Sequence, residues 1–307
     1  MIDIARAPRP TSPADVEGKV TRLRDALASR GSLLVGFSGG VDSALLAVVA
    51  HDVLGERMLA VLGVSASLAA DVHARARQIA NDFGVPFREM ATHELDDENY
   101  VANRGDRCFQ CKQELWRKLA PLADVLGFAA LADGTIVDDL SEHRPGKAAG
   151  ARAGVWSPLA ECGLTKDDVR AAARLRGIPI WNAPAAPCLS SRLATGVTVT
   201  TERLARVERA ETALRALGIT GDLRVRHLGD AARVELPAGS VAEWERAPRR
   251  AALAAAVHAA GFARVLLDRR GYRRGSVSTQ ERADAETGDV IEITSGPAPD
   301  TLPKGHA

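Results

Sequence analysis

The chain has 307 residues and lacks both a long apolar segment at its start and a large number of cysteines. Residues 1–13 are rich in proline and contain no apolar run long enough for a signal peptide or a membrane-spanning helix. Four cysteines in a chain of this length are too few for the disulfide framework of a small secreted domain. These absences predict a cytoplasmic protein with no membrane partner.

An excess of charge is also missing. Lys and Arg total 40 against 39 for Asp and Glu, which gives a net charge of +1. Proteins that bind nucleic acid through its phosphates usually carry a basic excess, so this balance argues against a nucleic-acid partner. The hydrophobic content of 46% and the length suffice for about two domains with real cores.

The most informative stretch is 33–46. A short apolar run, 33–35, precedes two glycines that allow positive φ, and an Ala/Leu-rich segment with helical spacing follows. A strand, turn and helix in this order direct free main-chain N–H groups at one point, which predicts an anion site. The residues expected to bind a nucleotide there are Ser38, Gly39, Gly40, Asp42 and Ser43.

The turn differs from the common nucleoside-triphosphate loop because no lysine follows its glycines. It contains Asp42 instead. A carboxylate beside a polyphosphate is repulsive unless a hard cation lies between them, so Asp42 indicates Mg²⁺.

Strands alternate with helices over the first half of the chain, which predicts a doubly wound parallel sheet of the α/β class. In such a sheet ligands bind at the carboxyl ends of the strands, where the glycine turn and the pair Gly134 and Thr135 both fall. The expected strands are 33–35, 58–64, 87–90 and 125–132, and the expected helices are 14–30, 69–83 and 168–177.

The pattern changes near residue 187. A charged helix over 200–217, two alternating strands at 223–227 and 232–236, a helix over 240–260 and a strand at 264–268 predict a smaller α+β domain with an antiparallel strand pair. The expected organisation is a disordered N-terminus over 1–14, domains over 15–186 and 187–278, and a disordered tail over 279–307.

The cysteines differ in their surroundings. Cys108 and Cys111 form a Cys-x-x-Cys pair. The pair is either a redox dithiol or, as we favour, two structural cysteines at the start of a helix. A zinc site is not expected, because no second Cys/His pair has the required spacing. Cys188 lies in a proline-rich loop close to Arg192. A guanidinium there would favour the thiolate, so Cys188 is the expected nucleophile, against the alternative of an ordinary loop cysteine.

Charged side chains offer further candidates. Arg224 and Arg226 alternate on one strand and can grip a phosphate or carboxylate, although a solvated sheet face explains such a pair equally. Asp138 and Asp139 suit either Mg²⁺ or the first turn of a helix. Four glutamates are metal or base candidates only if they converge in space: Glu208, Glu211, Glu235 and Glu243.

The run Ser38-Gly39-Gly40-Val41-Asp42-Ser43 resembles the pyrophosphate loop of the ATP-pyrophosphatases. Over about residues 15–278 the chain further resembles the LarE family of ATP-dependent sacrificial sulfur transferases, which mature the nickel-pincer nucleotide cofactor of lactate racemase. The matching segments are 38–43, 107–112, 134–135 with 138–139, 157–159 with 163–166, 188–192, 224–226, and 271–273 with 275–276.

This resemblance implies adenylation of a carboxylated pyridinium mononucleotide by ATP with Mg²⁺, and transfer of the Cys188 sulfur to it, leaving dehydroalanine. It also implies roles for single residues. Ser191 and Arg192 would line the sulfur-transfer site, and Arg224 and Arg226 would hold the substrate phosphate. Asp42 and Asp139 are the carboxylates expected at Mg²⁺ from their own chemistry. Glu211 and Glu235 would bind a second divalent metal at the sulfur-transfer site.

The resemblance also bears on bound clusters and assembly, and two positions of this chain differ from the family pattern. Some relatives hold an iron–sulfur cluster on three clustered cysteines, but Cys188 has no neighbour in its loop, so no cluster is expected here. A homo-oligomer, a hexamer by resemblance, and other cofactor-maturation proteins are the expected partners. Ile136 stands where the family usually has Asn, and Phe109 where it often has a larger aromatic residue.

Three alternatives remain open at this level. A tRNA thiolase of the same superfamily would need a basic surface, which the net charge does not supply. An ammonia-using amide synthetase would need an ammonia source. A nucleotide sensor that binds ATP without cleaving it would leave the Cys188 loop unexplained.

Overall fold

The computed structural model describes residues 12–141, 145–184, 187–273 and 288–294, which form two compact units. The first unit comprises Met1–Asp97 and Asp106–Ala186, and the second comprises Glu98–Gly105 and Pro187–Ala307. None of the described helices is long and apolar enough to cross a membrane.

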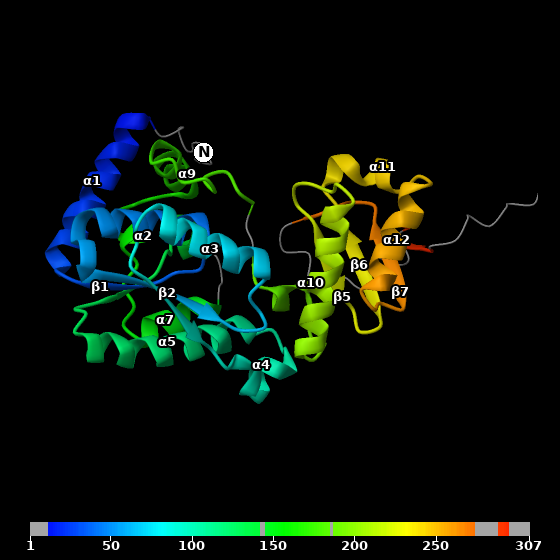
Figure 1. Cartoon of the computed structure of the whole chain (residues 1–307), viewed down its shortest axis with the longest axis horizontal. Helices are drawn as coiled ribbons and strands as arrows, with labels where there is room; N and C mark the ends of the chain where they lie inside the picture. The colour runs from blue at the N-terminus through cyan, green and yellow to red at the C-terminus, as the bar shows by residue number, and fades with distance from the viewer. Residues whose placement is uncertain (1–11, 142–144, 185–186, 274–287, 295–307) are drawn as a thin grey trace, which may run out of the picture. The chain divides into compact units, whose positions relative to one another are not determined.

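The first unit is built on a four-stranded parallel sheet with strand order β3-β2-β1-β4. Its buried apolar strands explain why helices cover both faces, as Figure 1 shows. Helices α1, α2, α3 and α9 pack on one face, and α5 with α7 on the other. The strands are β1 Leu33–Gly36, β2 Met58–Val64, β3 Phe87–Ala91 and β4 Leu131–Ala132.

The helices of this unit follow the apolar periodicity of the sequence. α1 begins at Pro13 behind a capping box in which Ser12 and Asp15 bind each other's main-chain N–H groups. The helices are α1 Pro13–Arg30, α2 Val41–Leu54, α3 Ala70–Asp82, α5 Arg107–Leu126, α6 Val137–Ser141, α7 Pro145–Arg152, α8 Pro158–Glu161 and α9 Lys166–Leu175, with 3₁₀ turns at Gly55–Arg57 and Glu94–Asp96.

The second unit contains a mixed sheet with strand order β5-β6-β7-β8. β5 and β6 are antiparallel, as the sequence predicted, β6 and β7 are parallel, and β7 and β8 are antiparallel. Its elements are α4 Glu98–Ala102, a 3₁₀ turn at Leu189–Arg192, α10 Thr201–Ala216, β5 Arg224–His227, β6 Ala231–Glu235, a 3₁₀ turn at Ala238–Ser240, α11 Val241–Trp244, α12 Arg249–Ala259, β7 Arg264–Asp268 and β8 Val290–Ile293. The predicted class, a parallel α/β domain with a smaller α+β domain, is confirmed.

Segment 98–105 belongs to the second unit, although the sequence suggested a continuous first domain over 15–186. Asn103 explains the difference. Its side-chain amide donates hydrogen bonds to the main-chain oxygens of Ala194 (2.7 Å) and Val197 (3.0 Å), and its own carbonyl accepts from Gly196 N. These contacts fasten the segment to the stretch that follows the Cys188 loop.

Three expected elements differ from the structure. The strand predicted over 125–132 is reduced to Leu131–Ala132, because α5 continues to Leu126. The helix predicted over 240–260 is divided into α11 and α12. Strand β8 lies within the predicted disordered tail 279–307, whose residues 279–287 and 295–307 are outside the described residues, as are 1–11 of the predicted disordered N-terminus.

Candidate functional site

The predicted anion site lies at the end of β1 in the first unit. Gly39 has φ +71°, and a Cβ added to it would lie 3.0 Å from the Cβ of Ala76 on α3. Gly40 is the N-cap of α2, and no side chain of the described residues caps its amides. The N–H groups at the start of α2 therefore have the geometry that the predicted anion site requires.

The two serines of the loop are bonded to each other. Ser43 Oγ accepts a hydrogen bond from Ser38 N at 3.2 Å, lies 3.0 Å from Ser38 Oγ, and donates to Gly40 O at 3.0 Å. This arrangement closes the loop into a compact ring and keeps both hydroxyls beside the helix start.

Gly134 is brought against the same loop. A Cβ on Gly134 would lie 2.8 Å from Ser43 N and 3.0 Å from Ser43 Cα, so only glycine lets β4 and α2 approach this closely. Thr135 follows, with its N–H and hydroxyl donating to Asp133 at 3.1 and 2.9 Å, and Ser157 Oγ donates to the same carboxylate at 2.8 Å. Asp133 was not predicted as a site residue, yet it organises this edge.

Asp42 is paired with a lysine from the distant helix α9. Lys166 Nζ lies 2.9 and 2.8 Å from the two carboxylate oxygens of Asp42. Lys166 N donates to Asp138 Oδ2 at 2.9 Å, which fixes the start of α9. The glycine loop contains no lysine of its own, and Lys166 of α9 brings a positive charge to it. The only signal for Lys166 in the sequence was its place in the segment 163–166.

Asp138 and Asp139 lie in the first turn of α6. Asp139 Oδ2 accepts from Ile136 N at 3.1 Å, while the Ile136 side chain is buried in the core. Asp138 thus accepts a main-chain N–H at the start of α9, and Asp139 accepts one just before its own helix α6. These contacts agree with the second of the two interpretations considered from sequence, carboxylates at helix starts. The described residues hold no group of three or more His, Cys, Asp or Glu side chains able to bind a metal ion.

A Mg²⁺ ion bound together with ATP fits this edge of the sheet. Magnesium in nucleotide sites takes most of its ligands from phosphate and water and needs only one or two carboxylates. Asp42 is one such carboxylate, half-buried and next to the anion site.

The second unit carries the Cys188 loop. Cys188 is half-buried and precedes the 3₁₀ turn Leu189–Arg192. Its Sγ lies 3.0 Å from Ser190 Oγ, whereas Ser191 Oγ donates to Cys188 O at 2.7 Å. The hydroxyl in contact with the sulfur is therefore that of Ser190, which is 1% exposed and was not predicted, and Ser191 stabilises the main chain.

Arg192 binds the loop rather than the thiol. Its Nη1 donates to the carbonyl oxygens of Pro187 and Cys188, and its Nε and Nη2 bind the two oxygens of Glu211 on α10 at 3.0 and 3.1 Å. The bidentate pair fixes the loop against α10. Arg192 therefore shapes the loop, and its predicted effect on the Cys188 thiolate stays a prediction.

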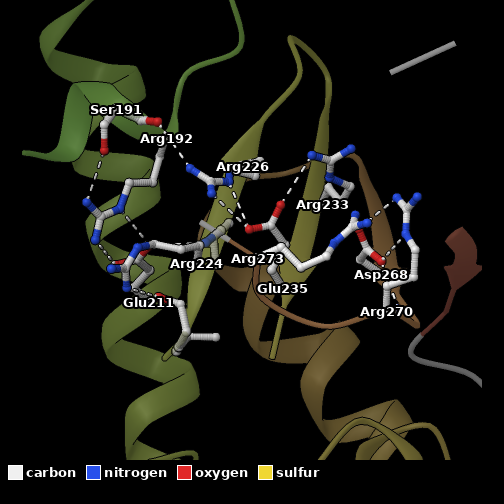
Figure 2. Close-up of polar contacts among 12 residues, drawn as sticks. Ser191, Arg192, Glu211, Arg224, Arg226, Arg233, Glu235, Asp268, Arg270 and Arg273 are labelled. Carbon is white, nitrogen blue, oxygen red and sulfur yellow. Dashed lines mark hydrogen bonds and ion pairs between the residues drawn. The ribbon is translucent and has the colours of Figure 1, made fainter. Parts of the chain in front are cut away.

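The arginines of β5 are buried rather than solvated. Arg224 and Arg226 are 4% and 5% exposed. Arg226 donates Nε to Glu235 Oε2 at 3.0 Å and Nη1 to Ser191 O at 3.2 Å, and Arg233 binds Glu235 Oε1 at 3.2 Å. Figure 2 shows these contacts, which join β5 to β6 and to the 3₁₀ turn Leu189–Arg192. The alternative that Arg224 and Arg226 lie on a solvated sheet face is therefore wrong.

Glu211 and Glu235 do not fit the second divalent metal that the resemblance implied. Each carboxylate uses both oxygens to accept hydrogen bonds from arginines, and Glu211 also accepts from Val225 N at 3.0 Å. Glu243 pairs with Arg249 on the surface, and Glu208 lies on α10. Glu211, Glu235 and Glu243 therefore each bind an arginine.

The remaining cysteines lie in the first unit, and none of the four cysteines forms a disulfide in the described part of the chain. Cys108 is exposed and Cys111 half-buried in the first turns of α5, where the predicted helix starts. Their exposure does not suit a core-packing role. Cys162 is buried, and burial raises the pKa of its thiol.

The chain is similar in sequence to a family model and to several known proteins. A family model described as NAD synthase matches residues 16–110. An uncharacterized protein of Synechocystis sp. is 40% identical over 263 residues, covering 86% of this chain and 98% of the relative. Pyridinium-3,5-bisthiocarboxylic acid mononucleotide synthase of Lactiplantibacillus plantarum is 33% identical over 270 residues, covering 86% and 95%. One component of the glutamine-hydrolyzing GMP synthase of Archaeoglobus fulgidus is 24% identical over 240 residues, covering 68% and 78%.

The match to the pyridinium mononucleotide synthase covers more of the chain than either unit could supply alone, so it extends over both. The chain belongs to the LarE family of pyridinium-3,5-bisthiocarboxylic acid mononucleotide synthases, within the ATP-utilising pyrophosphate-loop superfamily.

Proposed function

We propose that the chain is an ATP-dependent sulfur transferase that activates one carboxylate of pyridinium-3,5-biscarboxylic acid mononucleotide and transfers to it the sulfur of Cys188. The family relationship supports the substrate class. The observation that carries the proposal is the Cys188 loop, because a thiol is held there on a main chain fixed by Arg192 and Arg226. Such a loop presents a nucleophile close to guanidinium groups that suit a phosphorylated substrate.

The first step is adenylation. A substrate carboxylate oxygen attacks the α-phosphorus of ATP, the bond between the α-phosphorus and the bridging oxygen breaks, and pyrophosphate leaves. The amides at the start of α2 and the hydroxyls of Ser38 and Ser43 bind the departing pyrophosphate. Lys166 exchanges Asp42 for a phosphate oxygen in this state. Asp42 would hold Mg²⁺ bound with ATP, and the ion would supply positive charge that offsets the charge of the phosphates.

The second step moves sulfur. The Cys188 thiol loses its proton and attacks the acyl carbon, AMP leaves, and a thioester forms. A base then removes the Cα proton of residue 188 and the Cβ–S bond breaks. The product keeps the sulfur as a thiocarboxylate, and the chain keeps dehydroalanine, so each chain acts once. Ser190 Oγ, 3.0 Å from the sulfur, orients the thiol. Arg224 and Arg226 hold the substrate phosphate.

Intact mass spectrometry tests this proposal directly. The chain is incubated with MgATP and the carboxylated mononucleotide, and its mass is compared before and after. Loss of H₂S lowers the mass by about 34 Da, and peptide mapping should place the change at Cys188 because the nucleophilic sulfur leaves with the product. Cys188→Ala should release pyrophosphate but form no thiolated product.

Two control variants make the test specific. Cys162→Ala and the double variant Cys108→Ser with Cys111→Ser should both lose the same mass as the parent. An unchanged mass together with thiolated product would point to an external sulfur donor. Loss of sulfur transfer in the double variant, with Cys188 intact, would also overturn the sacrificial route.

Amide formation is the alternative that the comparisons favour most, because a NAD synthase model and a GMP synthase component each match the chain. This alternative predicts that ammonium yields a carboxamide while residue 188 stays cysteine. Mass analysis of the small-molecule product in the presence of ammonium separates the two reactions.

A further inference from the structure

The turn that follows β7, residues 268–273, contains a motif that the proposed chemistry leaves unused, Gly271-Tyr272-Arg273. Asp268 is fully buried and accepts a hydrogen bond from Arg270 N at 2.9 Å, and its carbonyl accepts from Gly271 N at 3.1 Å. Arg273 Nη2 lies 3.6 Å from the same carboxylate. The buried carboxylate therefore fixes the shape of the turn.

The turn is also fixed to the end of β6. Tyr272 N donates to Leu236 O at 2.7 Å. Gly271 has φ +71°, and a Cβ on it would lie 2.8 Å from both Ala238 Cα and Leu236 O. No side chain fits at position 271, so glycine brings the next residue close to the sheet.

The residue placed there is Tyr272, whose ring faces Arg224. The guanidinium carbon of Arg224 lies 4.9 Å from the ring centroid, within the range of a cation–π contact. Arg224 also donates Nη1 to Leu223 O at 2.7 Å. The aromatic face of Tyr272 therefore adds an uncharged contact to the hydrogen bonds that hold this cation in place.

Arg224 needs such support because it lies in an unfavourable electrostatic environment. Burial lowers the pKa of its guanidinium, and the neighbouring charges of Arg192 and Arg226 act in the same direction, whereas Glu211 and Tyr272 oppose them. A dianionic phosphate would relieve the repulsion among the three guanidiniums. A ring that holds Arg224 without neutralising it leaves its charge for that phosphate.

We propose that Tyr272 is a positioning residue that presents Arg224 to the substrate phosphate and thereby sets the preference for a phosphorylated nucleotide over the corresponding nucleoside. The inference rests on the proposed function, in which Arg224 binds that phosphate. It assigns a role to the Gly271-Tyr272-Arg273 motif: glycine closes the turn, and tyrosine orients the arginine.

The experiment measures the affinity of the full chain for the carboxylated pyridinium mononucleotide and for its dephosphorylated nucleoside by calorimetry. Tyr272→Leu should weaken binding of the mononucleotide by about 10-fold and leave binding of the nucleoside unchanged. Tyr272→Phe keeps the π face and should retain the preference of the parent within about twofold. A merely structural role of Tyr272 would weaken both ligands alike.

A double-mutant cycle with Arg224→Gln tests whether Tyr272 acts through Arg224. If it does, adding Tyr272→Leu to Arg224→Gln should cause no further loss of mononucleotide affinity. Additive losses, or a Tyr272→Leu variant with the preference of the parent, would overturn the inference while leaving the proposed function intact. A parent chain that binds mononucleotide and nucleoside equally would instead overturn the phosphate site itself, and the inference with it.

Discussion

Lys166 and Asp42 form an ion pair across 124 positions of sequence, with Lys166 Nζ 2.8 Å from Asp42 Oδ2. Both side chains are partly exposed, so a ligand at the glycine loop can reach either of them. The pair joins the start of α9 to the start of α2, the helix that supplies the anion-binding amides. The lysine neutralises the carboxylate in this structure, and under the proposed function it would turn to the phosphates of ATP.

Lys166→Met should lower the rate of pyrophosphate release by about 100-fold, because a charged donor directed at developing negative charge contributes on this scale. The measurement is a coupled pyrophosphate assay with saturating ATP and the carboxylated mononucleotide. Lys118→Met is the matched control, since Lys118 is also partly exposed in the first unit but donates to the main chain at Ala91 O. Equal rates for the two variants would exclude a role of Lys166 in adenylation.

Gly134→Ala should weaken ATP binding by displacing the glycine loop. The added Cβ would lie 2.8 Å from Ser43 N, a contact that only main-chain movement can relieve, and overpacking of this kind costs about 1–3 kcal/mol. Calorimetry with MgATP should show a dissociation constant at least about 10-fold higher than that of the parent.

The control for that substitution is Gly18→Ala in α1, where an added Cβ meets nothing within 4 Å. Replacing a glycine inside a helix should leave ATP binding unchanged and raise the free energy of unfolding by up to about 1 kcal/mol. ATP affinity in Gly134→Ala equal to that of Gly18→Ala would mean that the loop tolerates the displacement.

Glu235→Gln should destabilise the second unit without any dependence on divalent metal. Glu235 is fully buried and binds Arg226 and Arg233, and removing one partner of a buried ion pair costs about 3–5 kcal/mol. Urea unfolding, followed with and without EDTA, should show the same loss in both conditions. A loss that disappears in EDTA would indicate that Glu235 holds a metal after all.

Much of the fold was predictable because burial left a clear pattern in the sequence. The strand 58–64 and the strand 264–268 were predicted with the bounds that the structure shows, since apolar runs between turn signals mark buried strands. The prediction of a strand over 125–132 was wrong in its bounds for a related reason. Val125 and Leu126 are apolar but 83% and 45% exposed at the end of α5, and apolarity alone does not reveal burial.

The candidate site was predictable where it depends on neighbours in sequence. The glycine loop and its two serines were found from local pattern, and the structure bonds them to one another. Lys166 and Asp133 were missed because their contacts join elements far apart in the chain. The burial of Arg224 and Arg226 was also beyond sequence reasoning, since it depends on contacts with distant residues: Tyr272 for Arg224, and Glu235 and Ser191 for Arg226.

His227 should make the stability of the second unit sensitive to acid. It is fully buried on β5, its Nδ1 accepts from Gly229 N at 3.2 Å, and its ring packs edge-on against Phe262. Burial, followed by the charges of Arg203 and Arg206, lowers its pKa from 6.5 to about 4. Above pH 6.5 the ring is neutral in both the folded and the unfolded chain, so it contributes its full stability there.

As the pH falls from 6.5 towards 4, the unfolded chain takes up a proton that the folded chain excludes, and the free energy of unfolding should fall by up to about 3 kcal/mol. His227→Asn keeps a hydrogen-bond acceptor but does not titrate, so it should be less stable than the parent at about pH 8 yet lose less stability between pH 6.5 and 4. Urea unfolding across this range, with His51→Asn on the first unit as the control, measures the difference. Parallel pH profiles for the parent and His227→Asn would show that the buried imidazole is not the group that senses acid.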